Sequence, residues 1–238
     1  MTILEKFLAE PGNSRCREYL LTTRLVHDLS VAAAGRGYDL LVYLPTVDGD
    51  GFDVILDDRD RLVPIQLKSI IRGGKAAGWN VHRSLIRPKA EEADLYGFEL
   101  SPSGSGRGGA VIVTTVWASD TAVHVSYAYT DIDVLSALWL GLISRPDPQE
   151  RRIKRLRADL QKDPTGVVEL PRSAFVAAAS PEHLLALAGL HSPITTAWRL
   201  QLRTLLRHMY LRGETPAPLD VLRKNIMEGI IKLAAPPT

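Results

Sequence analysis

Three polar residues, Asp53, Gln66 and Lys68, lie in two neighbouring segments that are otherwise mostly apolar. Asp53 follows a glycine-rich stretch, residues 47–52 (VDGDGF), and one residue separates Gln66 from Lys68. Alternate residues of a β-strand share a face, so Gln66 and Lys68 would point the same way. A carboxylate, an amide and an ammonium group placed together on central strands are costly to bury unless they are paired or coordinate something. An oxygen-rich cluster of this kind suits a hard cation such as Mg²⁺.

The elements that would position these residues form a β-hairpin. Two apolar segments, residues 52–56 and 62–71, flank a charged turn. If the turn lies midway between them, Asp53 lies opposite Gln66 on the neighbouring strand. The apolar residues that alternate with the polar ones would pack against a helix on the other face, and we expect both strands to be central in a sheet.

An acid on one strand, followed by glutamine, any residue and lysine on the next, resembles the motif of the PD-(D/E)XK nuclease superfamily. Gln66-Leu-Lys68 is similar to the Q-x-K form in Mrr-type restriction endonucleases and related defence-associated domains. The resemblance covers about residues 14–130. It implies an α/β fold of the restriction-endonuclease-like kind, with a central mixed sheet flanked by helices. It also implies Mg²⁺- or Mn²⁺-dependent hydrolysis of DNA, in defence or repair, with RNA as a further substrate to test.

The resemblance also implies a role for each residue of the site. Asp53, the side-chain oxygen of Gln66 and the backbone carbonyl of Leu67 would bind the metal, and Lys68 would orient the attacking water. In such families a glutamate on the first helix often joins the site, and Glu18 has that place here. Because Gln66 is neutral, this site has one negative charge fewer than an acidic version and should bind metal more weakly.

Two other interpretations of the same residues stay open. Asp53 and Lys68 could form an ion pair with a purely structural role. Alternatively, the chain could be a catalytically inactive nuclease-fold protein that binds nucleic acid or assembles with a partner, and the missing third acid favours this alternative.

Nucleic-acid contacts would have to come from local groups of basic residues, because the formal net charge is only +2. Four residues near the hairpin or in the following loop are candidates for phosphate contacts: Arg83, Arg87, Lys89 and Arg107. A second basic group spans residues 151–157. Arg199, Arg203 and Arg207 recur every four residues, so they define one face of a helix, which we expect to be exposed.

The remaining pattern predicts the order of the other elements. We expect a helix at 13–34, strands at 39–44, 79–87, 110–117 and 122–129, and helices at 89–96 and 134–142. Composition changes after residue 144, and helices are predicted at 145–162, 181–190, 193–211 and 218–233. We therefore predict a nuclease-like domain at 1–144 and a helical C-terminal region at 145–238, which could supply partner helices or form a homodimer.

Other classes of protein fit the sequence poorly. Cys16 is the single cysteine, and the six histidines lack the spacing of a zinc site. Residues 104–109 match G-x-G-x-x-G, but they lead into a predicted strand, whereas a dinucleotide-binding loop opens a helix. The N-terminal residues do not resemble a secretory signal, and the most apolar window, 134–143, is about half the length of a membrane span. We expect a cytoplasmic protein with no membrane partner.

Overall fold

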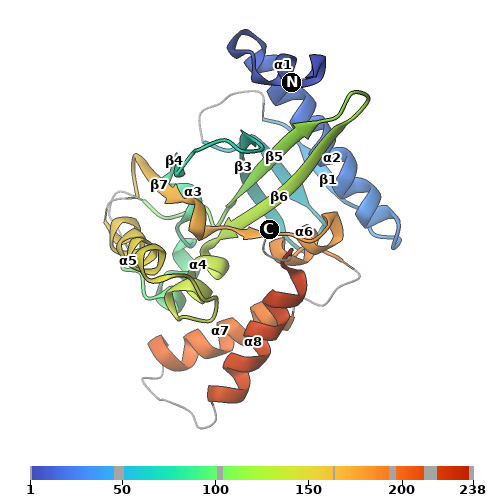
Figure 1. The fold of residues 1–238 in the computed structure, drawn as a ribbon. Helices are drawn as coiled ribbons and strands as arrows, with labels where there is room; N and C mark the ends of the chain where they lie inside the picture. Colours follow the sequence, from blue (N-terminus) through green and yellow to red (C-terminus); the bar gives the residue numbers. More distant parts are fainter. Residues whose placement is uncertain are drawn as a thin grey trace.

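The computed structural model describes residues 2–45, 51–100, 104–162, 164–192, 197–211 and 219–235. These residues form an α/β protein with a mixed six-stranded sheet and eight α-helices (Figure 1). The helices are α1 (Ile3–Ala9), α2 (Ser14–Ala34), α3 (Arg83–Ile86), α4 (Ile132–Trp139), α5 (Asp147–Gln161), α6 (Pro181–Ala188), α7 (Ala197–Leu206) and α8 (Leu219–Leu233). The strands are β1 (Leu41–Tyr43), β2 (Val54–Asp57), β3 (Leu62–Ile71), β4 (Gly78–His82), β5 (Ala110–Ala118), β6 (Val123–Asp131), β7 (Val167–Pro171) and β8 (Val176–Ala177).

The main sheet has the strand order β1-β2-β3-β5-β6-β8. Its neighbouring strands are antiparallel except for β3 and β5, which run parallel. A second, two-stranded sheet pairs β4 with β7. The α/β class and the mixed sheet flanked by helices are therefore confirmed.

The predicted hairpin is confirmed in its strands and in its register. Val54 pairs with Ile65 and Asp57 with Leu62, which is the register that sets Asp53 against Gln66. The turn between the strands contains Arg59 at φ 73°, whose backbone N–H donates to the Asp57 carboxylate at 2.7 Å. This local hydrogen bond helps to hold a residue with a side chain in a left-handed conformation.

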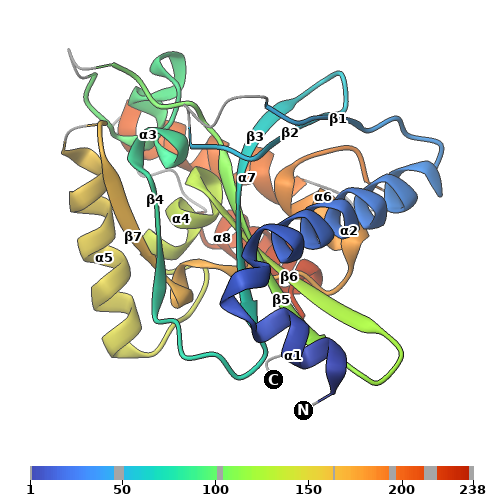
Figure 2. The same cartoon turned by 90° about the horizontal axis from the view of Figure 1, so that it is seen from above.

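Helix α2 covers one face of the hairpin, as its four-residue spacing predicts. Leu25 and Leu29 are buried in the same apolar cluster as Val54, Leu56 and Ile65. Figure 2 shows α2 alongside the sheet and next to α6. Nearer its N-terminus, α2 packs with α1 in a smaller cluster at the far end of β5. The alternate positions of β3 therefore face a helix, and the intervening positions, which include Gln66 and Lys68, face the other way.

The predicted strand at 79–87 is wrong in its second half. Strand β4 ends at His82, and residues 83–86 turn into the short helix α3. The reason is the partner strand: His82 pairs with Val167, the first residue of β7, and the bond from the backbone N–H of Arg83 to Gly166 is the last backbone hydrogen bond between the two segments. Beyond it the chain satisfies its backbone groups within helix α3, where the N–H of Arg87 donates to the carbonyl of Arg83.

The helices predicted after residue 144 are present within the described residues, but the same region also contains β7 and β8. Strand β8 joins the main sheet through β6, and β7 pairs with β4. These strands are short, and their partners lie far away in the sequence, so local patterns give little sign of them. The predicted boundary at residue 144 therefore crosses two shared sheets.

No helix in the described part of the chain is both long enough and apolar enough to cross a membrane.

Candidate active site at the end of the β2–β3 hairpin

Asp53 lies immediately before β2, where its backbone and carboxylate both contact β3. Its N–H donates to the carbonyl of Ile65 at 2.8 Å, and its Oδ2 accepts from the N–H of Leu67 at 2.5 Å. In an antiparallel pair, the N–H and C=O of one residue point to the same neighbour, so the carbonyl of Leu67 faces the same edge as its N–H. Asp53 and the Leu67 carbonyl, both predicted metal ligands, therefore share the edge of β3 that β2 leaves uncovered.

Gln66 has a half-buried side chain whose Oε1 is inaccessible to solvent and has no hydrogen-bond partner among the described residues. An amide oxygen buried in this way costs about 1–3 kcal/mol relative to one that is paired. Orphaned buried polar atoms of this kind call for an explanation, and a bound ion is one. Gln66 thus has an acceptor available at the position where the sequence predicts a metal ligand.

Lys68 and Glu18 line a common cleft of about 280 Å³. β2 pairs with only the first residues of β3, so Leu67, Lys68 and Ser69 all reach this cleft although their side chains alternate. Glu18 comes from α2, and Trp79 of β4 also lines the cleft. The structure therefore brings Glu18, Leu67 and Lys68 together, whereas Gln66 does not line this cleft.

The purely structural ion pair between Asp53 and Lys68 does not form. Within the described residues, the hydrogen bond shown for the Asp53 carboxylate goes to Leu67, and no ion pair joins it to Lys68. The half-buried Lys68 side chain is instead presented to the cleft.

One glycine of the stretch before Asp53, Gly51, is required by its surroundings. Gly51 has φ +73°, and a Cβ at this position would overlap the ring of His82. Glycine is therefore required twice, for its backbone conformation and for the close approach of the imidazole. Residues 46–50, which include most of the glycine-rich stretch, lie outside the described residues.

Two of the predicted phosphate contacts, Arg83 and Arg87, have guanidinium groups that bind backbone carbonyls. Arg83 donates to the carbonyls of Thr165 and Val167 at 3.0 and 3.2 Å. Arg87 is buried, with 3% of its surface exposed, and it donates to carbonyls at the end of α5, including that of Lys162 at 2.9 Å. The Arg87 side chain does not face solvent, so it is not available for the predicted phosphate contact.

The other two, Lys89 and Arg107, are exposed and line one pocket of about 380 Å³. Phe52, which directly precedes Asp53, lines the same pocket, and the Arg107 guanidinium lies 5.9 Å from the centre of its ring. Sequence analysis did not select Phe52; an aromatic residue between a glycine-rich stretch and a candidate acid is the signal that could have found it.

The donor atoms at the hairpin fit a weakly bound hard cation. Oxygen ligands suit Mg²⁺, and the Oε1 of Gln66, the residue that the strand register sets opposite Asp53, is buried without a partner in the described part of the chain. No group of three or more His, Cys, Asp or Glu side chains is arranged to hold a metal ion anywhere in the described ranges. A metal at this site would therefore depend on a single hairpin carboxylate, with Glu18 available across the cleft.

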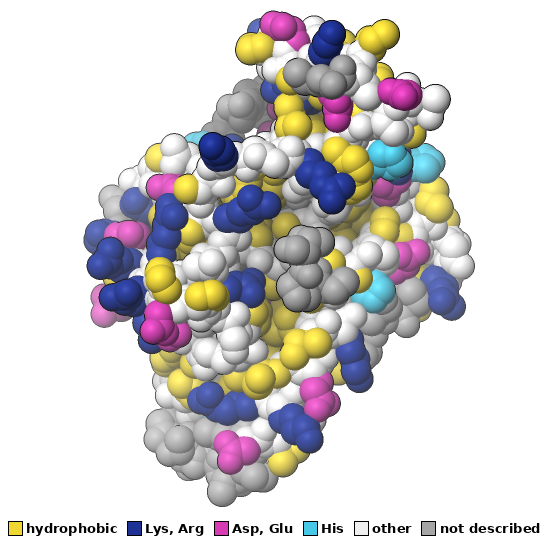
Figure 3. All heavy atoms as spheres, in the orientation of Figure 1, with side chains coloured by type: hydrophobic (Ala, Val, Ile, Leu, Met, Phe, Trp, Pro, Cys, Tyr) yellow, Lys and Arg dark blue, Asp and Glu magenta, His cyan; other side chains and the backbone are white. Residues whose placement is uncertain are grey.

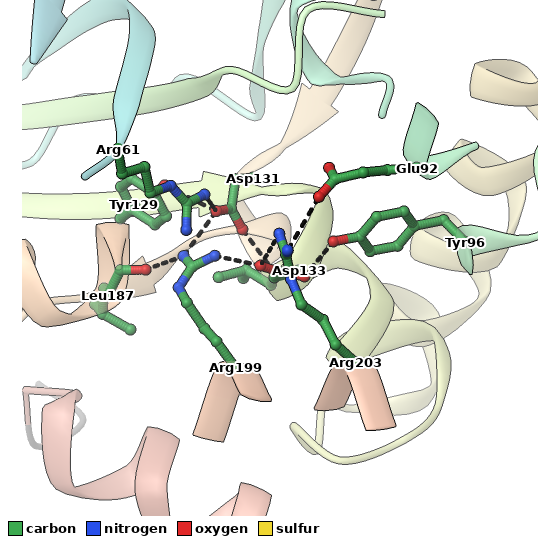
Figure 4. A network of polar contacts seen from close by, with 10 residues as sticks. Arg61, Glu92, Tyr96, Tyr129, Asp131, Asp133, Leu187, Arg199 and Arg203 are labelled. Atoms are coloured by element: carbon green, nitrogen blue, oxygen red, sulfur yellow. Dashed lines mark hydrogen bonds and ion pairs between the residues drawn. The ribbon is translucent and has the colours of Figure 1, made fainter. Parts of the chain in front are cut away.

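A second polar cluster lies at the C-terminal end of β6. It shows that the prediction of an exposed helix face formed by Arg199, Arg203 and Arg207 is wrong for two of these residues. Of these, Arg207 is exposed, whereas Arg203 is partly buried and Arg199 is buried. Figure 4 shows Arg199 between Asp131 and Asp133, with its Nη2 at 2.7 Å from Asp131, and Arg203 between Asp133 and Glu92. Sequence spacing alone could not distinguish this face from a solvated one.

This cluster is electrically balanced and mostly closed to solvent. Arg61 of the hairpin also approaches Asp131, at 3.8 Å, so three guanidinium groups meet the three carboxylates of Asp131, Asp133 and Glu92. Tyr96 donates its hydroxyl to Asp133 at 2.6 Å, and burial followed by this carboxylate raises the tyrosine pKa. With every charge paired, the cluster is structural rather than catalytic.

No protein family, curated protein or solved structure matches this chain.

Proposed function

We propose that this protein is a metal-dependent nuclease that hydrolyses phosphodiester bonds in DNA at the end of the β2–β3 hairpin. The mixed sheet flanked by helices agrees with the restriction-endonuclease-like fold that the motif implies. The observation that carries the proposal is the buried Oε1 of Gln66, which has no partner among the described residues and belongs to the residue that the strand register sets opposite Asp53. A metal ion there would satisfy an oxygen that is otherwise costly to bury.

In this proposal Asp53, Gln66 Oε1 and the Leu67 carbonyl would hold Mg²⁺ or Mn²⁺. When bound, the metal would supply positive charge that neutralises the phosphate and lowers the pKa of water. Lys68 donates hydrogen bonds from the cleft to the attacking water and to the phosphoryl oxygen on which negative charge develops. Glu18, on the opposite wall, can accept a proton from that water or approach the metal.

A second candidate function is a nuclease-fold protein that binds nucleic acid without cleaving it. It is favoured by the Asp53 carboxylate, which already accepts the Leu67 N–H and so closes the end of the hairpin. It is also favoured because no three His, Cys, Asp or Glu side chains among the described residues are arranged to hold a metal ion. Under either function, a role in defence or repair, a homodimer and a cytoplasmic location stay predictions.

The test is a cleavage assay with supercoiled, linear duplex and single-stranded DNA in Mg²⁺, Mn²⁺ or EDTA. We expect metal-dependent cleavage by the wild type, and a rate about 100- to 1,000-fold lower for Lys68→Ala, because a preorganised donor to the transition state is lost. Lys224→Ala, an exposed lysine on α8, is the matched control and should cleave like the wild type. Thermal melting checks that each variant is folded.

The outcomes separate the two functions. Cleavage that is unchanged in Lys68→Ala would show that the hairpin is not the active site. Absence of cleavage by the wild type, together with binding of the same DNA, would favour the inactive module. Absence of both would exclude DNA as the ligand.

A further inference from the structure

A groove of about 430 Å³ crosses the face of the main sheet opposite α2. Its floor includes Ile70 of β3 and Val113, Thr115 and Trp117 of β5, and Trp79 and Phe175 line it as well. In Figure 1, β4 and β7 lie to the left of the main-sheet strands β5 and β6. Figure 3, in the same orientation, shows hydrophobic side chains on this face with Lys and Arg side chains beside them.

The groove combines aromatic rings with positive charge. The Arg72 guanidinium lies 4.9 Å from the centre of the Trp117 ring, and the imidazole of His124 stacks on the same tryptophan at 5.6 Å. Arg172 is held at the end of β7 by its N–H bond to Ala77. Arg72 and Arg172 are exposed, and neither makes an ion pair in the described part of the chain. No Asp or Glu belongs to the described lining of the groove.

The groove leads to the candidate active site. Trp79 lines both the groove and the Glu18–Lys68 cleft, and its ring is fixed edge-on against Phe175 with centroids 5.3 Å apart. Lys68 and Ile70 point to the same face of β3, and Ile70 belongs to the groove floor. A ligand that occupies the groove would therefore extend towards Lys68.

We propose that this groove binds a single strand of nucleic acid, with a base against Trp79 and phosphates on Arg72 and Arg172, while Trp117, which lies between Arg72 and His124, supports Arg72. Stacking on protein aromatic rings requires unpaired bases, because a duplex keeps its bases stacked on one another. Exposed guanidinium groups without carboxylate partners suit a polyanion. The assignment of this strand as the substrate rests on the proposed nuclease function, whereas its binding can be measured without cleavage.

The test is fluorescence anisotropy in EDTA, with labelled single-stranded DNA, single-stranded RNA and a duplex of the same sequence. We expect either single strand to bind more tightly than the duplex, and the two single-stranded arms distinguish DNA from RNA. Trp79→Leu should weaken binding about tenfold, which is the size of one lost base stack, and Trp79→Phe should retain most of the affinity. Arg72→Gln should lower the slope of log K against log salt by about 0.7.

Arg36→Gln is the matched control, since Arg36 is exposed just after α2 and does not line the groove. Equal affinity of the wild type, Trp79→Leu and Arg72→Gln would overturn the proposal, and so would tighter binding of the duplex. Arg72 is at the surface, so its variant tests the groove even if Trp79→Leu fails to fold. Strong single-strand binding without cleavage in Mg²⁺ would support the groove as a binding site. It would contradict only the proposed nuclease function.

Discussion

Asp133 is completely enclosed by the protein, and its charge state depends on two arginines. Burial alone would raise its pKa, but the charges of Arg199 and then Arg203 outweigh burial and hold the pKa below its ordinary value. A carboxyl group with a depressed folded-state pKa stabilises the fold above its unfolded pKa, about 4, and this contribution is lost as the pH falls through the folded value.

We therefore predict that acid removes part of the stability through Asp133. At pH 7, Asp133→Asn should have a lower free energy of unfolding than the wild type, because Arg199 loses a charged partner. The difference should shrink as the pH falls below about 4, because the unfolded wild-type chain then takes up a proton at Asp133 that the folded protein does not yet take up. Urea unfolding of both proteins between pH 7 and 3 measures it, and a difference that is constant with pH would contradict the prediction.

The sequence predicts contacts between residues that are close in the chain better than contacts between residues that are far apart in it. The alternation of β3 and the charged turn are enough to bring Asp53 to the edge that carries Gln66 and Leu67. The environment of Arg199 could not be predicted, because its carboxylate partners lie 66 and 68 residues earlier in the chain. Whether a four-residue repeat of arginines faces solvent depends on what the fold sets against it.

Among the elements, α7 is joined to the sheet by charge as well as by apolar packing. Arg199 donates to Asp131 at the end of β6, to Asp133 of α4 and to the carbonyl of Leu187 in α6. Gly189, which ends α6 at φ +70°, leaves room for the Arg199 side chain. One side chain thus connects four elements.

We predict that Arg199→Met lowers the free energy of unfolding by about 3–5 kcal/mol, because two buried carboxylates lose a partner. Arg203→Met should lose less, since 31% of the Arg203 side chain is exposed. Arg155→Met, at an exposed position, should change the value by less than about 0.5 kcal/mol. Chemical denaturation of the three variants gives the order, and an equal effect of all three would rule out a special role for the buried pair.

Elements with a strong internal period could be predicted, and elements defined by a distant partner could not. Helix α2, the β2–β3 hairpin and β5 each have their own pattern of apolar residues, and they lie close to where that pattern puts them. The end of β4 is set by β7, about 85 residues later, and β8 is too short to have a period of its own.

At the scale of the whole molecule, the two predicted regions depend on each other. Besides the shared sheets, Ala178 forms a bridge with Ala234, so the end of α8 returns to the chain next to β8. A chain that stops at residue 144 would lose β7, β8 and Arg199 together.

We predict that residues 1–144 alone do not fold cooperatively. Asp131 and Asp133 would remain in an apolar setting without Arg199 or Arg203, which costs several kcal/mol against a total stability of about 5–15 kcal/mol. Thermal unfolding followed by circular dichroism should show a broad transition for this fragment and a sharp one for the full chain. A sharp transition in the fragment would show that it is an independent domain.

The parallel pairing of β3 with β5 also bears on how the chain reaches this fold. These strands are neighbours at the centre of the sheet, yet residues 72–109, including all of β4 and α3, lie between them. The entropy of closing so long a loop must be lost before the central contacts form. Hairpins such as β2–β3 and β5–β6 can assemble early, so docking of the two hairpins is the step expected to limit the folding rate. During synthesis, the apolar faces of the first hairpin would then wait for residues that leave the ribosome later.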